Sequence, residues 1–281
     1  MKSGWMLVAG FLFALMGVFV KLGARHFSAA ELVFYRSLIG LVVIYAIVRQ
    51  QRLSLATAHL RMHLWRGLSG FLALMLFFYA ISTLPLATAI TLNYTSPLFL
   101  ALLLSLVLRR KPAWWLIATL LLGFVGVVLL LNPRFHGTDF LPRLLGLASG
   151  FLAGVAYLNV RQLGAAGEPE WRVVFYFTLV CTVGAGFWML VHDFHGLGWG
   201  DLPLLLGLGL TATLAQLAMT RAYRLGHPLV VGSLAYSTVV FASLFGIVLW
   251  GEVLAPVSWL AIALIVASGA ISSAVTSRRP A

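Results

Sequence analysis

The chain carries very little charge, because only 9% of its 281 residues are Asp, Glu, Lys or Arg while 62% are hydrophobic. A soluble domain has roughly 25% charged residues. Charges are absent from long stretches of the chain, as in segments that lie in lipid. The composition therefore excludes a water-soluble globular protein. Because each crossing of the bilayer takes about 20 residues, ten helices and their loops use the whole length and leave no room for a soluble domain.

Acidic residues and cysteine are scarcer still. The chain has seven Asp and Glu residues, and none lies in the middle of an apolar segment, so no carboxylate proton relay is indicated. The single cysteine, Cys181, excludes an intrachain disulfide and a thiol cluster for metal. The metalloprotease, nucleophile-elbow and P-loop patterns are also absent. We therefore expect no metal, no cofactor and no catalytic residues.

The sequence does have a regular series of ten apolar segments. They are separated by turn and breaker pairs such as Asn132-Pro133 and Ala255-Pro256. The predicted fold is an all-α integral membrane protein of ten transmembrane helices. These helices are expected over residues 4–20, 31–48, 63–82, 86–108, 112–131, 141–160, 172–191, 202–220, 228–250 and 256–275.

The net charge of +12 comes from basic residues that lie mostly in alternate loops. With the N-terminus inside, 14 Lys and Arg residues fall on the inner side and 4 on the outer side. Cytoplasmic loops collect such residues, so we expect an inner-membrane protein with both termini cytoplasmic, in contact with lipid and not with nucleic acid. The inner set is Lys2, Arg49, Arg52, Arg61, Arg66, Arg109, Arg110, Lys111, Arg161, Arg172, Arg221, Arg224, Arg278 and Arg279.

The two halves of the chain resemble each other at a nearly constant offset. Each half has five segments, an odd number, so the second half enters the membrane from the opposite side. We predict two inverted-topology five-helix repeats, residues 1–136 and 137–281, in a single membrane domain. Such repeats place a site near the midplane between them and favour a transporter. The matches include Gly10-Phe11-Leu12 with Gly150-Phe151-Leu152 at an offset of 140, and Leu92, Tyr94 and Phe99 with Leu234, Tyr236 and Phe241 at 142.

Polar side chains gather in the middle of the fourth and ninth segments. Pro97 cannot donate to the carbonyl of Asn93, so the helix opens there, and in lipid that carbonyl needs another partner. The kink either lines a cavity or is tolerated through backbone bonds from Ser and Thr. The matching patch in the other repeat favours the cavity. The substrate-binding candidates are Asn93, Tyr94, Ser96, Ser233, Tyr236 and Ser237, with Pro97 as a kink or gating residue.

Gln216, in the middle of the eighth segment, has the apolar Leu74 as its repeat counterpart. A buried amide must find hydrogen-bond partners, which indicates either a cavity residue or a bond between helices. Tyr157 and Tyr79 are further substrate-binding candidates. A Tyr near a helix end is often part of an interfacial aromatic belt instead, and this applies most to Tyr79.

Arg36 is the only charge that the sequence places well inside a segment. An intramembrane charge is a functional hypothesis by default, and this one is suited to attract a substrate carboxylate. Its position near the outer end of its segment also allows it to snorkel outward or to pair with Glu31 or Glu252. The structural interpretation is slightly favoured, and Arg36 stays among the candidates.

These features together resemble the drug/metabolite transporter superfamily, in the branch built from two EamA repeats. The end of the ninth segment is similar to the Leu-Gly-Glu of that family, whereas the first repeat departs from it with Arg109-Arg110. The resemblance implies a ten-helix bundle with a central cavity and alternating access, in a family whose members mostly export amino acids and other small metabolites from bacteria. It is carried by Leu84-Pro85-Leu86-Ala87 through Pro97 to Gly126, and by Gly226-His227-Pro228 through Trp250-Gly251-Glu252 to Gly269.

The sequence therefore predicts a monomeric or homodimeric transporter that exports amino acids, aromatic ones among them, and related small metabolites. One alternative is another solute, such as a nucleotide sugar, a vitamin or a drug. A pore is a further alternative, distinguished by fluxes that do not saturate. An alternative of another class is an integral membrane enzyme that modifies lipids, with the outer-loop residues His192, Asp193, His195 and Asp201.

Overall fold

The computed structural model describes residues 2–84, 86–108, 113–132, 140–192, 194–251 and 253–278, and in these ranges every regular element is helical. Two short 3-10 turns, Lys2–Gly4 and Trp199–Asp201, precede α1 and α9. The α-helices are α1 (Trp5–Gly23), α2 (Ala29–Gln50), α3 (Leu60–Thr83), α4 (Leu86–Asn93), α5 (Ser96–Leu108), α6 (Trp114–Leu131), α7 (Phe140–Ala165), α8 (Glu170–Met189), α9 (Leu202–Leu225), α10 (Pro228–Ala235), α11 (Ser237–Trp250) and α12 (Pro256–Arg278).

Each of the ten predicted segments corresponds to one helix or to a pair of consecutive helices, which confirms the all-α membrane fold. Among the described residues, nine helical spans are long and apolar enough to cross a bilayer. The remaining segment, the third in chain order, forms α3, which is 24 residues long but carries Arg61, His63 and Arg66 in its first two turns. These three side chains lower its hydropathy, and two of them are buried against other helices.

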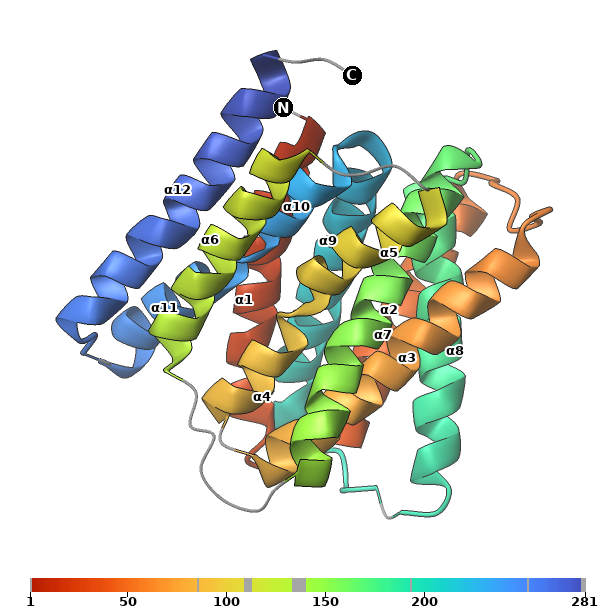
Figure 1. Ribbon diagram of the computed structural model, residues 1–281. Helices are drawn as coiled ribbons and strands as arrows, with labels where there is room; N and C mark the ends of the chain where they lie inside the picture. Colours follow the sequence, from red (N-terminus) through yellow and green to blue (C-terminus); the bar gives the residue numbers. More distant parts are fainter. Residues whose placement is uncertain are drawn as a thin grey trace.

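The helices form an antiparallel bundle in which α1 begins and α12 ends at the same end (Figure 1). We call this end the termini side; it also holds the last turns of α7 and α9 (Figure 1). The other end, where α1 ends and α2 begins, is the distal side. Arg221 lies over the ring of Trp5 on the termini side, and Lys21 lies over the ring of Trp250 on the distal side.

The fourth and ninth segments are each broken in two. The first break lies at Tyr94 and Thr95, between α4 and α5, directly after Asn93, whose carbonyl Pro97 cannot bond. The second break lies at Tyr236, between α10 and α11. At an offset of 142 residues, Pro97 corresponds to Val239, so the second helix breaks without a proline. The two breaks are therefore a property of both repeats and not of one residue.

A glycine of the opposite repeat packs against each break. A Cβ atom on Gly150 of α7 would lie 2.6 Å from the carbonyl oxygen of Leu92, and one on Gly10 of α1 would lie 2.7 Å from Ser237 Oγ. Real Cβ atoms do not approach that closely, so only glycine allows these helices to touch the breaks. Gly10 and Gly150 are 140 residues apart in the sequence, so they occupy corresponding positions in the two repeats.

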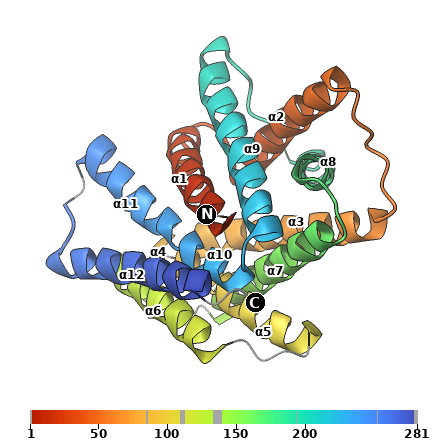
Figure 2. The same ribbon diagram turned by 90° about the horizontal axis from the view of Figure 1, so that it is seen from above.

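Helix packing follows the same two-fold relation. The pair α3 and α7 corresponds to α9 and α1, the pair α5 and α7 to α11 and α1, and the pair α3 and α8 to α9 and α2; all six pairs are in contact. Viewed from above, α6 and α12 pack together at one side of the bundle, and α2 and α8 lie at another (Figure 2). The central helices α1, α3, α7 and α9 thus meet their partners from the other repeat, as an inverted repeat requires.

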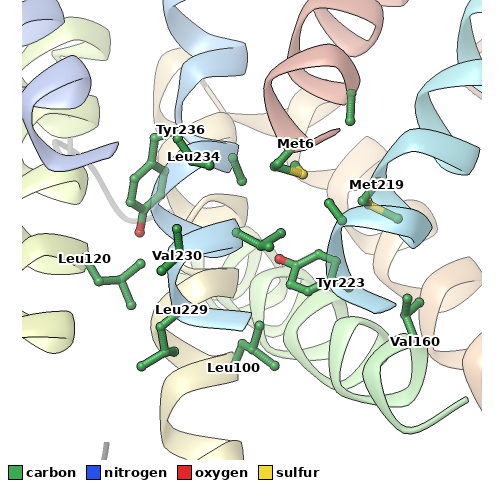
Figure 3. Packing of buried hydrophobic residues seen from close by; sticks show 14 of the residues in the cluster. Met6, Leu100, Leu120, Val160, Met219, Tyr223, Leu229, Val230, Leu234 and Tyr236 are labelled. Carbon is green, nitrogen blue, oxygen red and sulfur yellow. The ribbon is translucent and has the colours of Figure 1, made fainter. Parts of the chain in front are cut away.

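The largest buried cluster lies where α9 and α10 meet helices of the first repeat. Tyr223 and Tyr236 are its largest fully buried side chains. Figure 3 shows both within one cluster that also holds Met6, Leu100 and Val230. These aromatic rings bring hydroxyl groups into an otherwise apolar interior, which bears on the site described next.

Candidate functional site

Two arginines are buried in the membrane-spanning part of the bundle. Arg36 of α2 is 7% exposed and Arg66 of α3 is 3% exposed. Their guanidinium groups are close enough to repel each other, and the thiol of Cys181 in α8 lies within the electrostatic reach of both. Two positive charges are therefore buried on α2 and α3 within electrostatic reach of each other, where charge is costly to bury.

The surroundings of Arg66 hold its guanidinium in place. The guanidinium carbon lies 4.1 Å from the centre of the Phe177 ring, a cation–π contact. Nη2 donates to Gln216 Oε1 at a long 3.4 Å, while Nε and Nη1 have no hydrogen-bond partner in the described part of the chain. Gly70, one turn later in α3, leaves the space that Nη1 occupies. Arg66 is therefore positioned with two of its donor groups unused.

Arg36 occupies a different environment from the one expected. Its Nη1 donates to Met16 Sδ at 3.5 Å, a weak acceptor, and its side chain points into the bundle instead of snorkelling outward. The predicted pairing with Glu31 is not formed, because the Glu31 carboxylate accepts from the backbone N–H of Ser28 at 2.7 Å and of His195 at 2.6 Å. Glu252, the other predicted partner, lies outside the described residues.

A small cavity separates Arg36 from Gln216. Its volume is about 10 Å³, enough for one water molecule. Hydroxyl groups of neighbouring helices line it, among them Thr178 and Thr213, which each donate to a carbonyl of their own helix. Their oxygens keep lone pairs free, so the cavity wall carries polar groups beside Phe177 and Ala212. Gln216 lines this cavity and also accepts a bond from Arg66 of another helix, so the cavity residue and the bond between helices, which the sequence offers as alternatives, are both present.

The two broken helices bring a pair of tyrosines together. The ring centres of Tyr94 and Tyr236 are 6.3 Å apart, and Phe124 of α6 lies 6.3 Å from Tyr236 on its other side. The Tyr94 hydroxyl is within hydrogen-bonding reach of Thr238, whereas the buried Tyr236 hydroxyl has no partner among the described residues. The breaks of the two repeats therefore meet at an aromatic contact near the centre of the bundle.

A second pair of tyrosines joins α7 to α9. Tyr157 and Tyr223 stack with ring centres 5.1 Å apart and planes 18° from parallel. Ser96 is within hydrogen-bonding reach of the Tyr157 hydroxyl, and Tyr157 also interacts electrostatically with Arg66. Tyr157 thus connects the arginine pocket to the broken helix of the first repeat.

The remaining predicted residues divide into two groups. Asn93 Nδ2 donates to Ser149 Oγ at 3.1 Å, so the break at α4 is tied to α7. Ser233 donates to the carbonyl of Leu229 in its own helix, and Ser237 Oγ is buried beside α1 without a hydrogen-bond partner in the residues that the structure describes. The structure does not bring Tyr79 to this group, because its side chain is 42% exposed on α3.

Pro97 packs where the two broken helices meet. A Cβ atom added to Gly232 of α10 would lie 3.1 Å from the Cβ of Pro97, so the glycine lets α10 approach the start of α5. The prediction that the helix opens before Pro97 agrees with the break at Tyr94. Its role in gating stays a prediction.

The last turns of α7 and α9 close the bundle on the termini side. Arg161 Nη1 donates to the carbonyl oxygens of Tyr223 and Arg224 at 3.4 and 3.0 Å. Arg224 Nη1 also pairs with Glu170 Oε2 at 2.6 Å, and a Cβ on Gly164 would lie 2.9 Å from Arg224 Cγ. We call the contact made by Arg161, Tyr223, Arg224 and Glu170 the termini-side gate.

The termini-side gate has no comparable counterpart on the distal side. In the two-fold relation between the repeats, α7 corresponds to α1 and α9 to α3. The contact of α7 with α9 therefore has its counterpart between α1 and α3. Among the described residues these two helices lack comparable packing, although the contact of α3 with α7 and its counterpart, α9 with α1, are both present. The bundle is therefore closed between α7 and α9 on the termini side and less tightly packed between α1 and α3 on the distal side.

Burial and charge shift two ionisable groups in the termini-side loops. Burial raises the pKa of Glu168, but hydrogen bonds from Thr57 and Arg172 outweigh this effect, so its pKa is lowered on balance. Burial lowers the pKa of His227, and the charge of Arg161 lowers it further. Glu168 is 4% exposed and pairs with Arg172 at 2.8 Å, which ties the loop before α8 to the loop before α3.

Sequence reasoning missed two residues of this region. The sequence counts Arg66 only among the inner basic residues, whereas the structure buries its side chain between helices. Tyr223 was placed beyond the end of its segment at residue 220, whereas α9 continues to Leu225. The repeat held a signal for Tyr223: its counterpart at an offset of 142 is Ile81, which was placed inside the third segment.

Of the outer-loop residues of the enzyme alternative, the three that the structure describes each bond a different group. The His195 ring bonds Glu31 at 2.8 Å, His192 bonds the carbonyl of Trp188, and Asp201 accepts from the backbone of Gly198. Asp193 lies outside the described residues. In the described part of the chain no group of three or more His, Cys, Asp or Glu side chains is placed to hold a metal ion.

Comparison with known proteins identifies relatives over nearly the whole chain. The profile of the EamA-like transporter family matches residues 2–132 and 141–274. The pseudopaline exporter CntI of Pseudomonas aeruginosa is 34% identical over 90% of this chain and 89% of its own length. The riboflavin transporter of Vibrio cholerae is 28% identical over 94% and 90%. A crystal structure with 20% identity superposes with a TM-score of 0.84 over 99% of each chain, which shows the same fold.

Proposed function

Because the chain belongs to the EamA-like transporter family, we propose that it exports small metabolites, amino acids among them, across the inner membrane by alternating access. Its relatives carry the names of transporters of different solutes, so the family fixes transport and leaves the solute open. The solute is then inferred from the side chains of the site.

The observation that carries alternating access is the unequal closure of the two ends. An inverted repeat supplies the same helix contact twice, once on each side of the membrane. Here α7 and α9 make that contact on the termini side, through Tyr157, Arg161 and Tyr223, while α1 and α3 lack a comparable one among the described residues. This difference supports a carrier in a state that opens toward the distal side. The opposite state forms when the contact of α7 with α9 breaks and the corresponding contact of α1 with α3 forms.

We infer that the termini side faces the cytoplasm. The described basic residues at that end include Arg49, Arg52, Arg61, Arg172 and Arg221, and cytoplasmic ends of membrane helices collect such residues. With this orientation the distal side faces outward, and the less tightly packed end is the one through which an exporter releases its solute. The two repeats, residues 1–136 and 137–281, act as the two halves of the carrier, either in a monomer or in each subunit of a homodimer.

The aromatic side chains support a solute with an aromatic group. Tyr94, Tyr157, Tyr223 and Tyr236 come from four different helices or breaks and contact one another in two pairs. Aromatic rings bind other rings by offset or edge contacts, each contributing about 0.5–1.5 kcal/mol beyond area burial. Gln216 adds an amide beside the polar cavity. This combination suits a zwitterionic or aromatic amino acid, and a planar vitamin is the second candidate because it shares the ring contacts.

The proposal is tested by solute counterflow in proteoliposomes preloaded with threonine, methionine or phenylalanine. We expect saturable exchange, largest for phenylalanine, that falls at least fivefold in Gln216→Ala and Tyr94→Ala. Tyr45→Ala is the matched control, because this tyrosine is 48% exposed on α2, away from the site. Absence of exchange for all three amino acids, with reconstitution verified, would reject amino-acid transport, and riboflavin exchange would then favour the second candidate.

A further inference from the structure

We propose that Arg36 and Arg66 together bind a carboxylate group of the transported solute, so that a solute must carry a carboxylate to be recognised. This inference rests on the proposed function for the existence of a transported solute. It goes beyond that function by naming the chemical group that is recognised and the two side chains that recognise it.

The first argument is the cost of two buried positive charges. Both guanidinium groups lie in membrane-spanning helices, and their side chains are 7% and 3% exposed. A charge buried without a partner is strongly unfavourable, and two like charges near each other add repulsion. A fold that keeps both groups in this position is stabilised when an anion lies between them. Intramembrane charges of this kind are usually functional and not structural.

The second argument is that the described part of the chain supplies no anion for them. Its carboxylates lie at helix ends and are already bonded to other groups. Glu31 accepts from Ser28 and His195, Glu168 from Thr57 and Arg172, Glu170 from Arg224, and Asp201 from the backbone of Gly198.

The third argument is the set of unused donor groups. Arg66 leaves Nε and Nη1 without partners among the described residues, while Phe177 and Gly70 fix the plane of its guanidinium. Arg36 Nη1 donates to a thioether, the Sδ of Met16, which is a weak acceptor. A guanidinium presents its N–H groups as a planar fork that matches the two oxygens of a carboxylate. Arg66 thus presents preorganised donor groups without an acceptor among the described residues, and Arg36 directs one of its donors at a weak acceptor.

The fourth argument concerns the position of the pocket. Gln216, which bonds Arg66, also lines the cavity that reaches Arg36, and Tyr157 links Arg66 to the tyrosine pairs. A solute whose ring contacts the tyrosines would therefore extend its carboxylate toward the arginines. The present cavity of about 10 Å³ holds one water, so a carboxylate enters only when Arg36 leaves Met16 and the helices separate.

A purely structural role for Arg66 leads to a different expectation. If the guanidinium served only to pack against Phe177 and to bond Gln216, the protein would not distinguish a carboxylate from an amide of the same shape. If the two arginines bind the solute, the neutral amide loses charge-assisted hydrogen bonds, which are about twice as strong as neutral ones. The preference for acid over amide is therefore the property that separates the two roles.

The test compares phenylalanine with phenylalaninamide, and 3-phenylpropionate with 3-phenylpropionamide, on the purified full-length protein. Binding is followed by the rise in thermal unfolding temperature in detergent, and recognition by inhibition of phenylalanine counterflow. We expect each acid to act at a concentration at least tenfold lower than its amide. Equal potency of acid and amide would overturn the inference, as would the lack of any carboxylate effect on stability.

Substitutions then assign the preference to the two side chains. Arg66→Gln and Arg36→Gln should each reduce the preference for the acid to less than threefold, while Arg66→Lys, which keeps the charge, should retain part of it. Arg61→Gln is the matched control, because Arg61 lies in the same helix but is exposed. A preference for the acid that persists in both glutamine variants would reject the assignment. Partial retention of the preference in Arg66→Lys would show that the glutamine variants lose it through the missing charge and not through misfolding.

The outcomes also separate this inference from the proposed function. If phenylalanine and its amide exchange equally well, amino-acid transport stands and the arginine site fails. If no amino acid exchanges but 3-phenylpropionate stabilises the protein only when Arg66 is present, the carboxylate site stands and amino-acid transport fails. Stabilisation by chloride equal to that by 3-phenylpropionate would show a general anion site and overturn solute recognition.

Discussion

Tyr157 of α7 and Tyr223 of α9 stack with their ring centres 5.1 Å apart, on the side of the bundle where both helices end. Next to it, Arg161 donates to the carbonyls of Tyr223 and Arg224. The pair therefore connects the aromatic part of the candidate site to the closed gate on the termini side. Whatever opens this gate must separate two rings and expose two backbone carbonyls.

The hydroxyl of Tyr223 is expected to matter less than its ring. It is buried and has no hydrogen-bond partner in the part of the chain that the structure describes, so Tyr223→Phe should unfold within a few degrees of the wild type. Tyr223→Ala removes the stacked ring and leaves a cavity, which costs about 3–5 kcal/mol for large aromatic residues. Thermal unfolding of the two variants in detergent measures the difference. Equal loss in both would show that the hydroxyl has a partner and that the ring contact is secondary.

Loss of the Arg161 bonds should open the termini-side gate. A hydrogen bond from a charged group contributes about 1.5–3 kcal/mol, so Arg161→Gln should raise the open population at least tenfold. The probe is a single cysteine at Leu163, which is fully buried in α7, in a Cys181→Ser background. Its rate of maleimide labelling reports opening. Arg221→Gln at the same end is the control, since Arg221 packs on Trp5 and not on the gate. An unchanged rate in Arg161→Gln would contradict a gate at this contact.

The helices and the first of their breaks were accessible to sequence reasoning because they depend on local patterns. Apolar segments of about 20 residues fix transmembrane helices almost regardless of tertiary packing. Pro97 marked the first break through its missing N–H, whereas the second break, at Tyr236, was not predicted because no proline marks it. Gly10 and Gly150, which matched at the repeat offset, turned out to contact these two breaks.

The side chains that meet between helices were harder to predict, because hydropathy records burial in lipid and not the direction of a side chain. Arg66 lies in the second turn of α3, where an arginine usually extends to the interface. It is buried instead because Gly70 leaves space and Phe177 of another helix covers it. The pairing of Arg66 with Gln216 joins residues 150 positions apart, and no local pattern indicates such a contact.

Glu168 should make stability depend on acid pH. Its folded-state pKa is lowered below 4.5, because bonds from Thr57 and Arg172 outweigh its burial. A group with a lowered folded-state pKa stabilises the fold fully above its unfolded-state pKa and loses this contribution as pH falls through the folded-state value. The unfolding temperature of the wild type should therefore fall below about pH 4.5. Glu168→Gln should unfold earlier at pH 7 and show a smaller further loss on acidification.

The matched variant for this test is Glu170→Gln, two residues away. The Glu170 pair with Arg224 is more exposed, with side chains 19% and 31% accessible, so its loss should cost less than about 1 kcal/mol. Unfolding temperatures between pH 7 and pH 4 measure both variants. If Glu168→Gln and the wild type lose stability in parallel over that range, another group is responsible for the acid sensitivity.

The orientation is open to a direct measurement. If the termini side is cytoplasmic, green fluorescent protein fused after the last residue should fluoresce in a bacterial host, and alkaline phosphatase fused there should be inactive. Phosphatase fused after Asn132, which ends α6 on the distal side, should be active. The reverse pattern would invert the assignment and make the closed gate the outer one.

A methyl group on Gly150 should disrupt the first helix break. The added Cβ would meet the Leu92 carbonyl at 2.6 Å, the Asn93 carbonyl at 3.2 Å and the Thr95 hydroxyl, and backbone atoms cannot move aside as a flexible side chain does. Overpacking of this kind costs about 1–3 kcal/mol, so Gly150→Ala should lower both the unfolding temperature and the transport rate. Gly17→Ala is the control, because a Cβ there meets no atom within 4 Å and alanine is the better helix former. If Gly150→Ala matched Gly17→Ala in both measurements, the close packing of α7 against the break would not be needed for stability or for transport.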